Sequence, residues 1–287
     1  MQAPTHTPIS TPAATRRQRS DTATPSPSTA GVEQAARPAE ERALPQLGLR
    51  AIIAVWAAAA LPMGLLSWVA APLLADGLSG PGALVRALII TLTAGLVWQF
   101  VLVLGLVARE QGTLRWAVLR QALWLRAPHA PRSGRRGGRV WLVVVPLILA
   151  VGVVQLLPGV TAAAGRDLGE FLGSDAGESF LAGAWGWFAL IAAMGVFNTV
   201  LGEELLFRGY LLPRMHGRFG RRDWLANGVL HGAYHLHVPW AIPTSLLKSF
   251  MVSYCAKRYR SALIGIAVHS AQTVVFLALG LALVLQG

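Results

Sequence analysis

Residues 84–108 read LVRALIITLTAGLVWQFVLVLGLVA and contain a single charged side chain, that of Arg86. An α-helix rises about 1.5 Å per residue, so about 20 apolar residues cross the roughly 30 Å hydrocarbon core of a bilayer. This stretch therefore predicts a transmembrane helix. The whole chain of 287 residues has the same character, because 54% of its residues are hydrophobic and only 13% are charged. A typical soluble domain has about 25% charged residues, so we expect an integral membrane protein.

Other parts of the chain satisfy the same length rule. Four further spans are predicted, at about residues 51–74, 140–160, 180–212 and 261–285. Two shorter and more polar segments, 224–237 and 240–256, lie between the last two spans. Lipid cannot satisfy the hydrogen bonds of open backbone, so we expect these segments to be helices sheltered inside the bundle. The prediction is an all-α, polytopic helix bundle with about seven transmembrane helices.

The connections between the predicted spans alternate in charge. Cytoplasmic loops of membrane proteins accumulate Lys and Arg. A net charge of +15 is carried by the N-terminal segment up to residue 50 and by connections 109–139, 214–223 and 257–260. The intervening loop 159–179 carries −3, and Asp76 and Arg86 cancel. Seven spans with a cytoplasmic N-terminus satisfy this pattern. Because apolar runs separate the basic residues, the net charge of +12 does not indicate nucleic-acid binding.

The chain divides into two parts by composition. Residues 1–48 are rich in Pro, Thr, Ser and Ala and contain no apolar run, which predicts a disordered cytoplasmic tail. Residues 49–287 are expected to form the transmembrane helical domain. Several tryptophans fall near predicted span ends, where we expect them to anchor the helices at the interface. They are Trp56, Trp141, Trp185, Trp187, Trp224 and Trp240.

Ionisable side chains inside a predicted span are functional candidates, because their burial is costly. The fourth span contains Glu203-Glu204-Leu-Leu-Phe-Arg208. Glu204 and Arg208 are four residues apart and share a helix face, so an ion pair is expected between them. Glu203 points about 100° away on a regular helix and lacks that partner.

Histidines recur with helical spacing on two later segments. Asn227, His231 and His235 are four residues apart, as are His269 and Thr273. Counted from the charges on the inner side, Glu203, His235 and His269 all lie about 13 to 17 Å from the inner boundary. We therefore expect them to occupy one layer. Two chemistries fit such a layer: a carboxylate and histidine that activate water, or a metal site.

The run LGEELLFRGYLLPRM at residues 201–215, followed by a histidine-bearing helix and then His269, resembles the CAAX protease and bacteriocin-processing family of intramembrane proteases, also called the Abi family. The resemblance covers about residues 197–276. The family's second motif, Phe-x-x-x-His, reads His231-Gly-Ala-Tyr-His235 here, with histidine in place of phenylalanine. The family's third motif, His-x-x-x-Asn or His-x-x-x-Asp, reads His269-Ser-Ala-Gln-Thr273 here. Thr273 offers one hydroxyl donor, and Gln272 is expected to point elsewhere on the helix.

The resemblance implies an intramembrane endopeptidase that acts on a peptide or membrane-protein substrate in the lipid bilayer of a bacterial plasma membrane. It implies that Glu203, as general base, and His235 activate a water while His269 and Thr273 stabilise the oxyanion. Glu204 and Arg208 would support the site. The spacing of His231 and His235 leaves a cofactor open, because a zinc ion is also compatible with these residue types. Its ligands would be His231, His235, His269 and Glu203.

Two other classes of function stay open at this point. A non-catalytic membrane scaffold or bacteriocin-immunity protein would retain the motif for packing, and Thr273 in place of the usual Asn or Asp favours that interpretation. A small transporter would also have polar groups at mid-membrane depth. The span count is low for a transporter, however, and the sequence shows no internal repeat of the kind that many transporters use.

Overall fold

The computed structural model describes Met1, residues 44–80 and residues 82–287, so most of the predicted tail lies outside the described residues. Residues from Ala43 to Gly287 form one unit, and all its named elements are helical. Residues 44–48 were expected to belong to the tail, but they pack within this unit. The backbone N–H of Leu47 donates to the carbonyl of Arg214 at 2.9 Å. The Gln46 side chain also donates to the Pro213 carbonyl at 3.1 Å.

Five helical stretches are long and apolar enough to cross a membrane, and they confirm the five long spans predicted from sequence. In chain order they are α2–η2–α3 (Leu49–Ala75), α4 (Ala83–Gln111), η3–α6 (Gly138–Gln155), α9–η4–η5–α10 (Trp185–Arg214) and α14 (Leu263–Val284). The fourth stretch begins at Trp185 rather than near residue 180, because the short α8 (Asp175–Leu181) precedes it and a turn at Gly183, with φ +65°, separates the two.

Shorter helices join these long ones. On the connections lie α5 (Trp116–Ala122), α7 (Leu168–Leu172), α11 (His216–Phe219), η6 (Gly220–Arg222) and η7 (Pro239–Ala241). The two polar segments near the end of the chain form α12 (Asp223–Tyr234) and α13 (Ile242–Tyr259). With 12 residues, α12 is about 18 Å long and does not reach across the hydrocarbon core. Among the residues that the structure describes, five stretches qualify as spans by length and composition, and α12 and α13 are two further helices, so the expected count of seven transmembrane helices is approximate.

The helices α12 and α13 pack closely against each other because two glycines face the contact. Gly228 and Gly232 are four residues apart on α12. A Cβ atom added at Gly228 would lie 2.5 Å from the Phe250 ring, and one at Gly232 would overlap Leu246. Small residues at this spacing let helix backbones approach in membrane proteins. The close approach brings the polar face of α12 against serines of α13.

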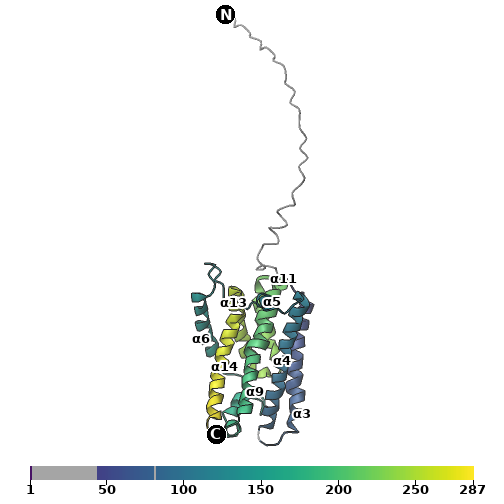
Figure 1. Cartoon of the computed structure of the whole chain (residues 1–287), viewed down its shortest axis with the longest axis vertical. Coiled ribbons are helices and arrows are strands. Elements are labelled where there is room, and N and C mark those ends of the chain that lie inside the picture. Colours follow the sequence, from purple (N-terminus) through teal and green to yellow (C-terminus); the bar gives the residue numbers. More distant parts are fainter. Residues whose placement is uncertain (2–43, 81) are drawn as a thin grey trace. The chain divides into compact units, whose positions relative to one another are not determined.

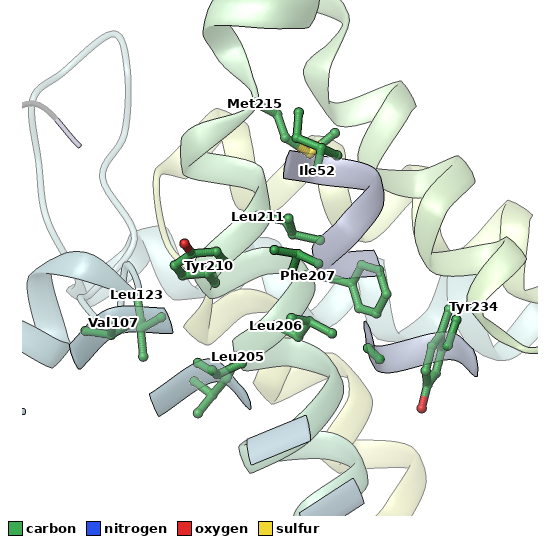
Figure 2. Packing of buried hydrophobic residues seen from close by; sticks show 14 of the residues in the cluster. Ile52, Val107, Leu123, Leu205, Leu206, Phe207, Tyr210, Leu211, Met215 and Tyr234 are labelled. Carbon is green, nitrogen blue, oxygen red and sulfur yellow. The ribbon is translucent and has the colours of Figure 1, made fainter. Parts of the chain in front are cut away.

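The largest buried cluster joins α2, α4, η5 and α12, and Figure 2 shows its centre. All seven residues of η5 (Leu205–Leu211) are buried. The Phe207 ring lies beside Tyr234, with ring centroids 5.5 Å apart, so the segment that follows the two glutamates packs directly on α12. In Figure 1, α9 and α14 run side by side, and α14 also contacts η4 (Phe197–Gly202), the segment that precedes the two glutamates.

Polar groups of α2 and η2 (Leu66–Ala70) hold the C-terminal end of α12. The Trp56 indole N–H donates to the Leu230 carbonyl at 2.8 Å, and the Trp68 indole donates to the Leu236 carbonyl at 2.8 Å. The Ser67 hydroxyl donates to the His237 carbonyl at 3.0 Å. These bonds satisfy carbonyls at and beyond a helix end. The Trp56 indole N–H is therefore used within the bundle, and the location of this residue at the membrane interface stays a prediction.

A first prediction concerns Gly265, where α14 meets Glu204. A Cβ atom there would overlap the Glu204 carboxylate, so we expect Gly265→Ala to lower the thermal stability of the purified protein by about 1 to 3 kcal/mol through overpacking. Gly105→Ala is the matched control, because Gly105 lies within α4 and has no neighbour within 4 Å of the added atom. Thermal unfolding in detergent measures both. Equal melting temperatures for the two variants would contradict this packing.

Candidate functional site

The two adjacent glutamates lie where the fourth span departs from regular α-helix. Glu203 and Glu204 stand between two wider, π-helical segments, η4 (Phe197–Gly202) and η5 (Leu205–Leu211). Glu203 is 3% exposed, Glu204 2% and Arg208 1%. Segments of π-helix are frequent at functional sites, because the wider turn redirects side chains and frees backbone groups. The three charges are thus buried at an irregular point of the helix.

Glu204 connects its own helix with α14. Its Oε1 atom lies 3.3 Å from Nη1 of Arg208, which confirms the ion pair expected from the four-residue spacing. The same oxygen lies 3.5 Å from Nδ1 of His269 on α14. One carboxylate therefore neutralises a buried guanidinium and also orients the His269 ring.

Glu203 makes its contacts with α12. Its Oε2 atom lies 3.2 Å from Nε2 of His231, and its carboxylate also interacts with the Tyr234 side chain. The histidine that contacts Glu203 is therefore His231 rather than His235, the residue that the resemblance paired with it. The reason is local: α12 ends at Tyr234, so His235 leaves the regular helix and no longer follows His231 on the same face.

His235 occupies the C-terminal cap of α12, and its ring orientation is fixed by the helix end. Its Nδ1 atom lies 2.9 Å from the carbonyl oxygen of His231. A carbonyl can only accept, so Nδ1 carries the hydrogen, and Nε2 of the neutral ring is left with a lone pair. The ring stacks on His237 at a centroid distance of 5.6 Å. His235 is thus held as a hydrogen-bond acceptor at Nε2.

The predicted site residues meet in one cavity of about 560 Å³. It is lined by Glu203, His235, His269 and Thr273, the four residues expected to carry the chemistry. Glu203, His235 and His269 thus line one cavity, and their expected common depth in the membrane stays a prediction. A neighbouring cavity of about 240 Å³, which includes Arg166, shares wall residues with the first. The shared wall consists of Leu92, Met194, His237, Val238 and Ala241.

The 560 Å³ cavity is lined by further polar residues that were not among the predicted site residues. Asn198 lines it from η4, Gln272 from α14 and Lys248 from α13. Gln272 was expected to point away from Thr273, and yet both residues line this cavity. Lys248 donates to Oε1 of Gln155 at 3.2 Å. An amide inside an apolar span was the signal that could have identified Asn198.

The predicted zinc ligands have other contacts. His231 contacts Glu203, His269 contacts Glu204, and His235 contacts the backbone of its own helix. Among residues 44–80 and 82–287, no three His, Cys, Asp or Glu side chains are grouped so that they could hold a metal ion. A zinc site built from these residues stays a prediction from spacing alone, and the arrangement described here offers it no ready ligand set.

The fold and the cavity define a polytopic helical membrane protein with a carboxylate and histidine site inside the bundle. Residues 185–275 match the family model described as Type II CAAX prenyl endopeptidase Rce1-like. This region, about a third of the chain, is similar to the CAAX protease family, and it includes every one of the predicted site residues. No curated protein and no solved structure matched the chain.

A second prediction follows from the buried ion pair. Arg208→Met leaves Glu204 as a buried charge with only His269 beside it, so we expect a loss of about 3 to 5 kcal/mol in unfolding free energy. Replacing both partners, as Glu204→Met with Arg208→Met, removes the uncompensated charge and is expected to recover much of that loss. Thermal unfolding in detergent measures the effect.

The control for this series is Arg218→Met, which removes an exposed arginine elsewhere on the chain. It is expected to leave the melting temperature nearly unchanged, as most surface substitutions do. A single Arg208→Met variant as stable as this control would show that the ion pair does not support the fold.

Proposed function

We propose that the protein is an intramembrane endopeptidase of the CAAX protease type. The observation that carries this proposal is the single cavity within the helix bundle that is lined by Glu203, His235, His269 and Thr273. All four residues lie inside the region that matches the Rce1-like family. A carboxylate and an imidazole acceptor on one cavity wall are suited to activating a water, and donors on another wall are suited to an oxyanion.

In the proposed reaction, a water is held between the Glu203 carboxylate and Nε2 of His235. Glu203 accepts one proton from this water as its oxygen attacks the carbonyl carbon of the scissile peptide bond. The bond between that carbon and nitrogen then breaks, and the proton held by Glu203 passes to the departing amine. The cap hydrogen bond of His235 supports this role, because it keeps the lone pair at Nε2.

The tetrahedral intermediate places a negative charge on the former carbonyl oxygen. We propose that His269 and Thr273, both on α14, stabilise this oxyanion. Asn198 and Gln272 line the same cavity and offer amide donors that Thr273 lacks. The role of Glu204 and Arg208 in this scheme is to support the site, because Glu204 contacts the His269 ring.

The proposed substrate is a peptide or membrane-protein segment that enters the site from the bilayer. The matching family is described as a CAAX prenyl endopeptidase, so a prenylated peptide ending in Cys-aliphatic-aliphatic-X is the first substrate to test. We further propose a bacterial plasma membrane as its location. A cytoplasmic N-terminus is proposed as well, since the basic connections then lie inside.

The third prediction tests the general base. Glu203→Gln keeps the size of the side chain but removes its basicity, and we expect it to abolish hydrolysis while the melting temperature changes little. Two quenched-fluorescence peptides of the same Cys-aliphatic-aliphatic-X sequence, one farnesylated and one not, serve as substrates for the purified protein. Glu178→Gln, an exposed acid on α8, is the control and is expected to keep wild-type turnover.

Equal turnover by the wild type and Glu203→Gln contradicts the proposal, including the case in which neither protein cleaves either peptide. That result would favour the non-catalytic scaffold or immunity protein. Cleavage of both peptides at similar rates would support the peptidase activity and would show that the enzyme does not recognise the prenyl group.

The fourth prediction concerns Thr273, which stands where the family motif has Asn or Asp. Thr273→Val removes the hydroxyl without changing the shape of the side chain, and we expect kcat to fall about tenfold or more with little change in KM if the hydroxyl contacts the oxyanion. Thr199→Val is the matched control, because its hydroxyl bonds the Gly195 carbonyl at 2.9 Å within its own helix. An unchanged kcat in Thr273→Val would assign oxyanion binding to other groups of the cavity wall.

A further inference from the structure

His231 is the buried histidine that the proposed reaction does not use. It lies on the face of α12 that packs against η5 and α13, and it is 7% exposed. The motif that the chain resembles has a phenylalanine at this position. Its aromatic surroundings suit such a ring, since Phe207 lies 4.7 Å and His235 5.2 Å from its centroid. Packing alone therefore does not require an imidazole here.

The polar contacts of His231 form a chain with a defined direction. The Ser249 hydroxyl donates to the Ser245 carbonyl at 2.5 Å. Because its hydrogen is committed to that carbonyl, the Ser249 oxygen can only accept from Nδ1 of His231, 2.5 Å away. The carbonyl at the start of the chain thus fixes which nitrogen of His231 carries a hydrogen. The other nitrogen, Nε2, is left for the carboxylate of Glu203 at 3.2 Å.

We propose that His231 is a positioning residue that holds the Glu203 carboxylate through this chain from Ser245 and Ser249. The inference rests on the proposed function, because it assigns a role toward the general base of that reaction. Because His231 engages Oε2, Oε1 would be the oxygen that takes the proton of the attacking water. One proton lies between Nε2 and Oε2, so the pair is hydrogen-bonded whichever atom carries that proton.

The chain is anchored on two helices, and this makes it suited to positioning. Ser245 and Ser249 lie on α13, one turn apart, and both are buried. Gly228 and Gly232 let α12 approach this face of α13. The position of the Glu203 carboxylate is therefore tied, through His231 and Ser249, to the backbone of α13, which is not the helix that carries Glu203. Supporting contacts of this kind maintain the orientation of a reacting group.

The fifth prediction tests this role by substitution at His231. We expect His231→Phe to fold, because the ring is replaced by an aromatic of the family pattern, and to lower kcat about tenfold or more with KM nearly unchanged. His231→Gln, which can still bond Glu203, is expected to retain more of kcat than His231→Phe. The farnesylated and unmodified peptides described above are the substrates.

The serine chain supplies a matched pair of variants. Ser249→Ala removes the acceptor of His231, and we expect it to lower kcat in the same direction. Ser253→Ala removes a buried hydroxyl one turn further along α13, where it bonds Asn227 at 2.9 Å, and is expected to leave kcat near the wild-type value. Adding Ser249→Ala to His231→Phe is expected to cause little further loss, since both changes interrupt one chain.

A measurement that needs no turnover separates this inference from the proposed function. The melting temperatures of His231→Phe, Glu203→Gln and the double variant form a thermodynamic cycle, and we expect their shifts to be non-additive because the side chains are in contact. Additive shifts, or a kcat of His231→Phe equal to that of the wild type, would overturn the positioning role. A wild type that cleaves neither peptide would contradict the proposed function, while the cycle would still report on the contact.

Discussion

Burying three charged side chains inside an apolar bundle is the constraint on which the structure of the site depends. Glu204 and Arg208 neutralise each other within one helix, and this occupies one face of that helix. Glu203 is left on a different face and must find its partner on another helix, which it does in His231. The glycines of α12 face α13 and let these two helices approach, which brings His231 against Ser249 as well. The buried charges thus find their partners only where neighbouring helices supply polar groups.

The parts of this structure that could be predicted from sequence are those with a local physical cause. Hydrophobic length predicts the five long spans, and the four-residue spacing predicts the ion pair of Glu204 with Arg208. The partner of Glu203 could not be predicted in this way. His235 shares helical spacing with His231, but α12 ends before His235, and hydrogen bonds from Trp68 and Ser67 hold the turn that follows. The four-residue spacing of polar residues cannot indicate where a helix ends when tertiary contacts set that end.

The remaining differences also come from departures from regular helix. The wider turns of η4 and η5 place Asn198 on the same cavity as Glu203, although the two are five residues apart. A regular helix would put such residues on different faces, which is why Asn198 was missed. Gln272 and Thr273 are neighbours and yet line one cavity, because its volume of about 560 Å³ spans more than one face of α14. Cavity width cannot be read from residue spacing.

Lys248 is a cationic side chain on the cavity that Glu203 also lines. Both residues line the same cavity, but the ammonium group of Lys248 donates to Gln155 on α6, and the ion pairs of the described residues do not include it. A direct salt bridge would stabilise the carboxylate and weaken it as a proton acceptor. His231 contacts the same carboxylate at Oε2, and in the proposed positioning role this contact fixes the orientation of the carboxylate. Because Lys248 bonds Gln155 instead, the Glu203 carboxylate has no salt bridge with this lysine, which suits the general-base role proposed for it.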